Sequence, residues 1–225
     1  MTTKEVGRRR AGRPKTSLLS RELIISTAFE VLQATGADGF TMTRLAEALG
    51  VQTPALYNHV ANKNAVLNGM RGRISRRMEP DVFARLPWDE AMIAWARSYR
   101  SAFAAHPEII ALLAMLPIDG ERNVVENYEA VSSALVRGGW PETEIVSTIV
   151  ATESFIIGSA LDALAPVGNM DPKPHTDLAP TLDRGLRERK AQADGAGVSE
   201  AALTFEIGLE VLIDGLRARL KRLTA

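Results

Sequence analysis

Apolar residues recur every three or four positions along most of the chain, a spacing that predicts helices. No stretch alternates apolar and polar residues as a half-buried strand does. Glycine and proline divide the pattern into segments, because both residues tend to end helices. The polar stretch 166–197 is expected to be a long loop with one or more helical turns over 182–191. The predicted helices cover 20–36, two short segments within 40–63, then 62–77, 88–105, 107–116, 121–138, 141–165 and 198–223.

The stretch from Phe40 to Lys63 reads as two short helices joined by a tight turn. Thr41 or Thr43 is expected to cap the first helix, because a side-chain hydroxyl accepts an unpaired backbone N–H there. Gly50 is expected to end that helix in the left-handed conformation that glycine favours. The inward faces of the two helices are apolar and hold Leu45, Ala46, Leu49, Leu56 and Val60.

The second of these helices is expected to begin at Thr53-Pro54, with the threonine as its cap and the proline in its first turn. Its outward face carries almost no Lys or Glu, which is unusual for a surface that only meets water. Helix, glycine turn and capped helix outline a helix-turn-helix, whose second helix enters the DNA major groove. An ordinary helical hairpin is the alternative. The outward positions hold Thr53, Ala55, Tyr57, Asn58 and His59.

The zero net charge hides a difference between the two ends of the chain. Residues 1–78 carry 13 Lys and Arg against 5 Asp and Glu, whereas residues 79–225 carry 14 against 22. Phosphate binding requires local positive charge, so nucleic acid is expected at the N-terminal end. Residues 1–19 are basic and interrupted by glycine and proline, which predicts a flexible arm that follows phosphates or enters the minor groove. A solubilising tail is the alternative.

The segment LAEALGVQTPALYNHVANKNAVL, residues 45–67, resembles the DNA-binding head of TetR-type transcriptional regulators. The likeness covers residues 20–75, and the rest of the chain is similar only in its helical pattern and in short pieces such as His106-Pro107-Glu108. The resemblance implies that the outward residues of the second helix touch bases and phosphates, and that the lysine opening the next helix contacts phosphate. The predicted DNA-binding residues are Thr41, Thr43, Arg44, Thr53, Pro54, Ala55, Tyr57, Asn58, His59 and Lys63.

One position departs from the family's type member. That protein has an arginine that contacts a base early in the first helix of the motif, whereas this chain has Thr43. The operator sequence therefore does not transfer to this chain.

Two long apolar helices predict a dimer interface. Residues 141–165 are apolar nearly all round, and a helix of this kind is buried on both sides. The resemblance implies a four-helix bundle made by this helix and residues 198–223 of each subunit, and reading a palindrome requires two-fold symmetry. Burial within one subunit is the alternative. The predicted interface residues are Ile149, Ile156, Ala160, Phe205, Leu209, Leu212 and Leu216.

A mostly aromatic stripe follows one face of the helix over 88–105. Its side chains combine an apolar body with a polar tip, which suits orienting contacts in a largely apolar pocket. Glu153 lies in the most apolar helix, and a buried carboxylate there needs either an interface ion pair or a ligand as its partner. Plain core packing is the alternative for each aromatic residue. The predicted ligand-binding residues are Met92, Trp95, Tyr99, Phe103, His106, Met115, Tyr128, Glu153 and Phe155.

Little in the sequence indicates catalysis or a metal site. The chain has no cysteine, and no pair of its 3 histidines has metal-ligand spacing on one helix. Asp171, His175 and Asp177 lie close together between prolines of the predicted loop, which leaves a metal site there as a minor alternative. No phosphate-cradling glycine loop or nucleophile elbow is present. We therefore expect no catalytic residue, no metal and no cofactor.

The chain is also expected to be cytoplasmic and to make no use of a membrane. No apolar run approaches the ~20 residues that a membrane span requires. The first residues contain charges but no apolar stretch after them, which does not fit a secretory signal.

These features predict an all-α protein with an N-terminal three-helix helix-turn-helix domain over 20–78 and a larger helical ligand-binding and dimerisation domain over 79–225. We expect a repressor that binds a palindromic DNA operator as a homodimer and is released by a small, largely apolar ligand. Two alternatives remain open, a constitutive or architectural DNA-binding protein without a ligand and an enzyme that carries a DNA-binding head.

Overall fold

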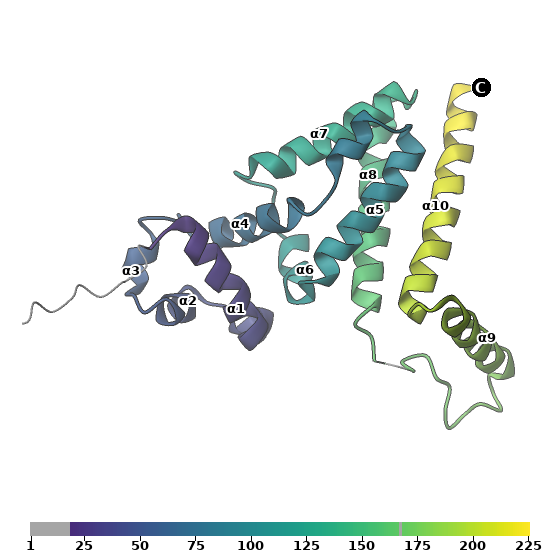
Figure 1. Ribbon diagram of the computed structural model, residues 1–225, viewed down its shortest axis with the longest axis horizontal. Coiled ribbons are helices and arrows are strands. Elements are labelled where there is room, and N and C mark those ends of the chain that lie inside the picture. The colour runs from purple at the N-terminus through teal and green to yellow at the C-terminus, as the bar shows by residue number, and fades with distance from the viewer. Residues whose placement is uncertain (1–18, 167) are drawn as a thin grey trace, which may run out of the picture.

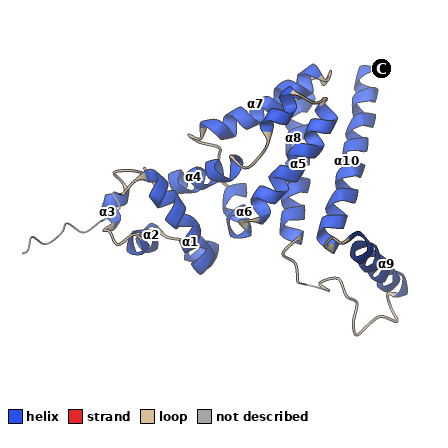
Figure 2. Cartoon of the chain, viewed as in Figure 1, coloured by secondary structure: helices blue, strands red, loops and turns tan. Residues whose placement is uncertain are grey.

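The computed structural model describes residues 19–166 and 168–225, and in these residues every regular element is a helix (Figures 1 and 2). This confirms the all-α prediction. The basic arm predicted over 1–19 lies, up to residue 18, outside the described residues. The elements are α1 (Arg21–Gly39), α2 (Met42–Ala48), α3 (Thr53–Leu56), α4 (Lys63–Ser75), the 3-10 helix η1 (Pro80–Ala84), α5 (Trp88–Ala104), α6 (Pro107–Ala114), α7 (Arg122–Arg137), α8 (Glu142–Asp162), α9 (Pro180–Ala196) and α10 (Glu200–Thr224).

The N-terminal domain packs α1, α2 and α3 around one apolar core. Ser20 caps α1, and its hydroxyl accepts the N–H of Leu23 at 3.2 Å. Gly36 breaks the helical path with a φ of 67°, after which a short turn continues to Gly39. Burial of each large aliphatic side chain in this core contributes about 1.5–3 kcal/mol. The fully buried core residues are Ile24, Ala28, Leu32, Phe40, Leu45 and Leu56.

Helix α4 joins this domain to the rest of the molecule. Asn62 caps it by accepting the N–H of Ala65 at 2.9 Å. Its inward residues Val66, Met70 and Ile74 are buried. The helix packs against α1 on one side and against α5, α6 and α7 on the other, and Figure 1 shows it between the two domains. Helix α1 also packs against α6, so the two domains meet through both α4 and α1.

Helix α5 is the centre of the larger domain. It begins directly after Pro87, as the predicted boundary requires, and it packs against α8, α7, α10 and η1. Met92 and Trp95 on this helix are buried. Helix α10 is held to the same body by ion pairs as well as by apolar contact. These pairs join Arg97 to Glu206, Arg217 to Asp89 and Arg219 to Glu144.

Helix α8 is long and apolar enough to cross a membrane by length and composition alone, with a mean hydropathy of 1.4. The expectation that no segment reaches this level is therefore wrong. In the structure α8 packs against α5, α7 and α10. Thr152 is fully buried on it and donates its hydroxyl to the carbonyl of Thr148 at 2.8 Å. These contacts are those of a core helix in a helical domain.

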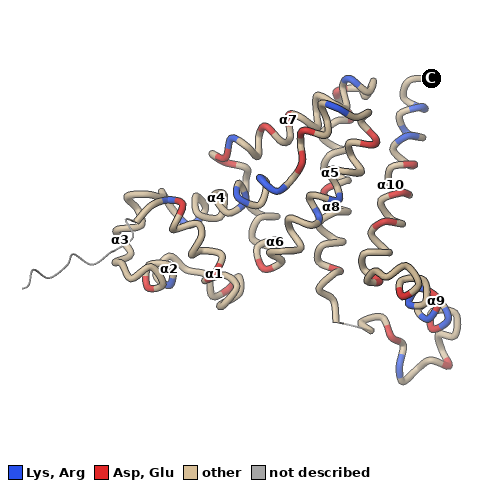
Figure 3. Tube along the Cα trace, viewed as in Figure 1, with Lys and Arg blue, Asp and Glu red and all other residues tan. Residues whose placement is uncertain are grey.

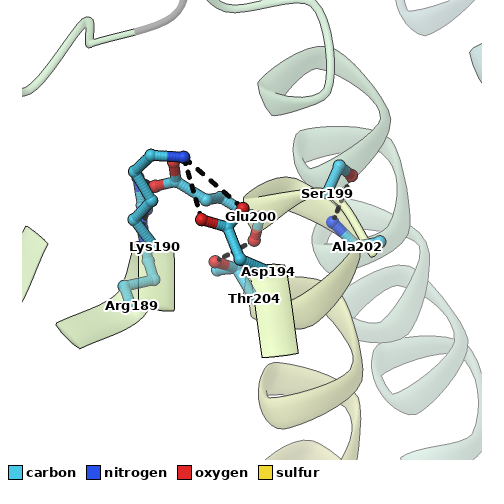
Figure 4. A network of polar contacts seen from close by, with 7 residues as sticks. All are labelled: Arg189, Lys190, Asp194, Ser199, Glu200, Ala202 and Thr204. Carbon is cyan, nitrogen blue, oxygen red and sulfur yellow. Dashed lines mark hydrogen bonds and ion pairs between the residues drawn. The ribbon is translucent and has the colours of Figure 1, made fainter. Parts of the chain in front are cut away.

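The polar stretch 166–197 contains much more helix than its sequence indicated. Residues 180–196 form α9, which meets the start of α10 at a corner (Figure 4). Arg189 forms an ion pair with Glu200 at 2.7 Å across this corner, and Gly197 ends α9 in the left-handed conformation with a φ of 67°. Pairs four residues apart, such as Lys190 with Asp194, add to the stability of a helix whose apolar pattern is weak.

Candidate functional site

The two helices of the predicted motif are joined by the expected turn, but the N-cap of the second helix differs from the prediction. Thr41, rather than Thr43, caps α2 by accepting the N–H of Arg44 at 3.2 Å. Gly50 has a φ of 67°, as predicted for the end of α2. The cap of α3 is Gln52 without a side-chain bond, so the prediction that Thr53 caps this helix is wrong. Thr53 is instead its first helical residue.

Regular α-helix in α3 ends at Leu56, but the coil continues as a tighter turn. Asn58 and His59 donate their N–H groups to carbonyls three residues back, at 3.4 and 2.9 Å. Tyr57 is 50% exposed, and Asn58 and His59 after it are exposed as well, whereas Val60 is buried. The outward set expected to meet DNA therefore does lie outward. Pro54, Tyr57, Asn58, His59, Thr41, Thr43 and Arg44 are exposed, whereas Thr53 and Ala55 are half-buried.

Two predicted DNA-binding cations are also bonded within the protein. The Lys63 ammonium donates to the carbonyl of Phe40 at 2.7 Å and lies 5.2 Å from the centre of the Phe40 ring. The Arg44 guanidinium donates to the carbonyl of Gly39 at 2.8 Å. These bonds fix both side chains next to the chain segment between α1 and α2.

A cavity of about 390 Å³ lies within the larger domain, between α4, α5, α6, α7 and α8. Most of its wall is apolar, as is usual for a small-molecule site. Five of the residues expected to bind a ligand line it, namely Trp95, Tyr99, Phe103, Tyr128 and Glu153. The aromatic stripe on α5 therefore indicated one wall of the cavity, through Trp95, Tyr99 and Phe103.

The other four predicted ligand-binding residues lie elsewhere. Met92 is fully buried in the core away from the cavity wall, and Met115, beyond the end of α6, is 88% exposed. Phe155 faces α10, where its ring stacks on Phe205 at 5.5 Å between centroids. His106 lies in a separate cavity of about 220 Å³, where its ring is 4.5 Å from that of Phe29 on α1. Burial lowers the pKa of His106, the charge of Glu108 opposes this shift, and the charges of Arg77 and Arg73 add to it.

Glu153 is the acidic residue of the cavity wall. Its Oε1 accepts hydrogen bonds from the hydroxyls of Tyr99 at 3.0 Å and Tyr128 at 2.7 Å. Burial raises the pKa of Glu153, and the two tyrosine donors and the charge of Arg71 oppose that rise. Burial likewise raises the pKa of both tyrosines, so their hydroxyls remain protonated donors. The sequence left two partners open for Glu153, an ion pair at the interface or a ligand. The side chain lines the cavity, which favours the ligand.

Arg71 of α4 is half-buried and lines the cavity. Its guanidinium donates to the carbonyls of Leu113 at 2.7 Å and Leu116 at 2.6 Å, where α6 ends, and to Pro117 at 3.1 Å. The three other arginines of this region, Arg73, Arg76 and Arg77, are exposed, and Figure 3 shows the Lys and Arg positions gathered along the end of α4. Arg71 therefore connects the linking helix to the cavity wall.

The sequence reading also missed a polar cluster on the α7 side of the cavity. Asn127 is buried, and its Oδ1 accepts the indole N–H of Trp95 at 3.1 Å. Its amide nitrogen contacts Ser75 Oγ at 3.4 Å and Met78 Sδ at 2.8 Å. Asn127 is a polar residue on the buried face of α7, and its place among apolar positions is the signal that would have indicated this cluster.

The residues predicted for the dimer interface are largely covered by their own subunit. Six of the seven, Ile149, Ile156, Ala160, Phe205, Leu209 and Leu216, are buried within the chain, and Leu212 is half-buried. The periodic apolar stripe thus marks the face that packs against α5 and between α8 and α10. The exposed apolar side chains of these helices lie on other faces, at Val146, Val150, Leu161, Ile207 and Val211.

Across residues 19–166 and 168–225, no three His, Asp or Glu side chains come together in a group able to hold a metal ion. Asp171, which the sequence offered as part of a possible site, pairs instead with Lys173 at 3.0 Å.

Comparison with known proteins agrees with this geometry. The protein-family model described as "Bacterial regulatory proteins, tetR family" matches residues 24–70. A second family model, "Tetracyclin repressor-like, C-terminal domain", matches residues 85–220, more than half of the chain. The chain belongs to the tetR family. It is therefore a DNA-binding transcriptional regulator, and the alternative of an ordinary helical hairpin at residues 40–63 falls away.

Relatives in the tetR family cover nearly the whole chain. It is 30% identical over 203 residues to the tetracycline repressor protein class A from transposon 1721 of Escherichia coli, covering 89% of this chain and 92% of that protein. It is 29% identical over 224 residues to the HTH-type transcriptional repressor DrrR1 of Streptomyces coeruleorubidus, covering 94% and 82%.

Solved structures have the same fold. A possible TetR family transcriptional regulator from Streptomyces coelicolor A3(2) is 28% identical, with a TM-score of 0.66 over 88% of this chain and 99% of that chain. Apo ActR from Streptomyces coelicolor is 24% identical, with a TM-score of 0.72 over 91% and 97%. The second likeness is evidence for the fold alone.

Proposed function

We propose that this chain is a repressor that binds a palindromic operator as a homodimer in the cytoplasm and is released by a small, largely apolar ligand. The observation that carries the proposal is the cavity of about 390 Å³ whose wall includes Arg71 of α4, the helix that joins the two domains. A ligand that prefers one shape of this cavity also prefers one position of α4, because the guanidinium holds the end of α6. Both relatives described above are named as repressors.

The proposed DNA surface is the outward side of α3 and the turn after it, from Thr53 to His59, with the start of α2 beside it. Lys63 contributes a phosphate contact. Its ammonium has three donors, and the carbonyl of Phe40 occupies one of them. The remaining donors serve the DNA backbone while the first holds the side chain in position.

The proposed dimer face consists of the sides of α8 and α10 that remain exposed. Val146 and Val150 on α8 are 70% and 53% exposed, and Val211 on α10 is 67% exposed. Glycines accompany them at Gly158 and Gly215, where an added Cβ would meet nothing within 4 Å. Exposed apolar side chains beside open backbone suit the close approach of a second pair of helices. This face replaces the buried residues that the sequence pattern favoured.

Two other functions fit the fold less well. A constitutive DNA binder has no use for a cavity of this volume with a carboxylate and two hydroxyls directed into it. An enzyme needs several convergent titratable groups at reacting distance, and the cavity wall holds one carboxylate, two tyrosines with raised pKa and one arginine bonded to backbone carbonyls.

Selection of duplex DNA from a random library with the full chain tests the proposed function. We expect enrichment of a two-fold symmetric sequence whose half-sites lie about one helical turn, ~34 Å, or a multiple of it apart. A Tyr57→Ala variant provides the matched negative selection, because this exposed side chain contributes little to the core. Failure of the wild type to enrich any sequence at low salt would refute DNA recognition.

A further inference from the structure

The polar pairing of Glu153 is incomplete on one side. Both tyrosine hydroxyls donate to the same carboxylate oxygen, Oε1, from α5 and α7. Among the described residues no donor bonds to Oε2, and no Lys or Arg nitrogen lies within 4.0 Å of the carboxylate. Glu153 thus presents one free acceptor to the cavity that it lines.

Aromatic rings line the same cavity as this carboxylate. Trp95 and Tyr99 contact each other edge to face at 5.2 Å, and Tyr99 and Phe103 follow at 5.0 Å along the same wall. Removing a carboxylate from water costs free energy that a hydroxyl pair offsets only in part, which agrees with the raised pKa of Glu153. A positive charge beside it would offset that cost, and the faces of the aromatic rings also attract cations.

The cavity's own cation is engaged elsewhere. Arg71 donates to three backbone carbonyls and to Asn68 Oδ1 at 3.0 Å, so its donors are held at the end of α6. An anionic ligand would have to displace these bonds and would also meet Glu153. A cationic ligand meets neither obstacle when its charge lies on the Glu153 side.

We propose that the cavity selects an apolar organic amine, whose protonated nitrogen donates to Glu153 and whose hydrocarbon body lies among Trp95, Tyr99, Phe103 and Tyr128. The inference rests on the proposed function, since it names the chemical class of the ligand that releases the operator. A cavity of about 390 Å³ accommodates a molecule of roughly two fused rings with a short amine arm.

Three probes of similar size and shape differ in charge, so their affinities isolate the effect of the charge. 1-Naphthylmethylamine carries the ammonium, 1-ethylnaphthalene is neutral, and 1-naphthoic acid is anionic. Calorimetric titration into the full-length protein at neutral pH should show the amine binding at least tenfold more tightly than the neutral probe, with no binding of the acid. Binding of the amine should weaken as the pH falls and Glu153 becomes protonated. Absence of amine binding, or equal affinity for the neutral probe, overturns the inference.

Two variants identify the carboxylate responsible. Glu153→Gln keeps the size of the side chain and removes its charge, so the tenfold preference for the amine should disappear. Glu142→Gln removes an exposed charge from the same helix and should keep the preference. A preference that survives in Glu153→Gln, with the variant folded by circular dichroism, would assign amine binding to another group.

Operator binding measured in parallel separates this inference from the proposed function. If naphthoic acid or ethylnaphthalene releases the selected operator and the amine does not, the amine class is wrong while the repressor remains. If the wild type selects no operator at all, the proposed function fails whatever the cavity binds.

Discussion

The guanidinium of Arg71 on α4 donates a 2.7 Å hydrogen bond to the carbonyl oxygen of Leu113 on α6. Carbonyls in the last turn of a helix have no partner within the helix, and the negative end of the helix dipole favours a cation there. The same guanidinium bonds to the carbonyl of Leu116. One side chain therefore joins the helix that carries the DNA-binding head to a helix that lines the cavity.

Replacing Arg71 by Met should uncouple the two sites. The variant keeps an apolar stem of similar reach but loses every donor to α6, so a ligand would still bind while operator affinity responded less. We expect the ligand-induced loss of operator affinity to fall from the typical range of about 5–150-fold toward onefold. Arg76→Met is the matched control, since it removes an exposed charge next to the same helix. An unchanged ligand response in Arg71→Met would exclude this route of coupling.

Replacing Tyr57 by Ala should weaken operator binding without unfolding the domain. The side chain is 50% exposed, so its loss should change the free energy of unfolding by less than about 0.5 kcal/mol. Loss of one base-reading side chain corresponds to about 1–3 kcal/mol, or about 5–150-fold in affinity. Leu56→Ala, at the fully buried neighbouring position, should instead cost about 2–5 kcal/mol of stability. Wild-type operator affinity in Tyr57→Ala would show that α3 is not the recognition helix.

Replacing Val211 by Glu should separate the proposed dimer. The side chain is 67% exposed in the single chain, so the substitution should leave the subunit folded but place a charge at the seam between subunits. Val125→Glu on α7 is the control, because that position is 57% exposed and lies outside the proposed face. Sedimentation at micromolar concentration should give a dimer for the wild type and the control, and a monomer for Val211→Glu. A wild-type monomer would remove both the interface and the palindromic operator.

Replacing Glu153 by Gln should stabilise the ligand-free protein at neutral pH. Because the folded state raises the pKa of Glu153, it binds more protons than the unfolded state once the pH exceeds the ordinary value of 4.5. Glu153 thus lowers stability as the pH rises from 4.5 to its folded pKa, above which the loss is constant, and the neutral amide avoids this loss. Thermal melts of both proteins between pH 4 and pH 8 should diverge as the pH rises. Parallel melting curves would contradict the buried environment of the carboxylate.

Local signals in the sequence predicted the N-terminal domain well. Ser20, Thr41 and Gly50 act through their own or neighbouring backbone groups, so their roles follow from spacing alone. The cap at Thr53 failed because the chain starts α3 one residue earlier, and proline in the first turn allows either register.

Contacts between distant segments were not predictable in the same way. The carbonyls that bind Arg71 lie 42 to 46 residues away along the chain. An arginine among the other arginines of α4 gave no sign of these contacts. Phe155 is apolar whichever neighbour it meets, and only packing directs it to Phe205. The same ambiguity applies to the predicted interface residues, because periodicity shows that a helix such as α8 is apolar on several sides without saying which side the subunit covers itself.

The central claim is that a ligand in the cavity weakens operator binding. One thermodynamic cycle tests this claim most directly. 1-Naphthylmethylamine is titrated into the free protein and into the protein saturated with its selected operator duplex, and the operator is titrated with and without the amine. Linkage requires each ligand to weaken the other by the same factor, which we expect to be about 5–150-fold. Equal amine affinity in the free and the DNA-bound protein would contradict release by the cavity ligand and leave a DNA-binding protein that this ligand does not regulate.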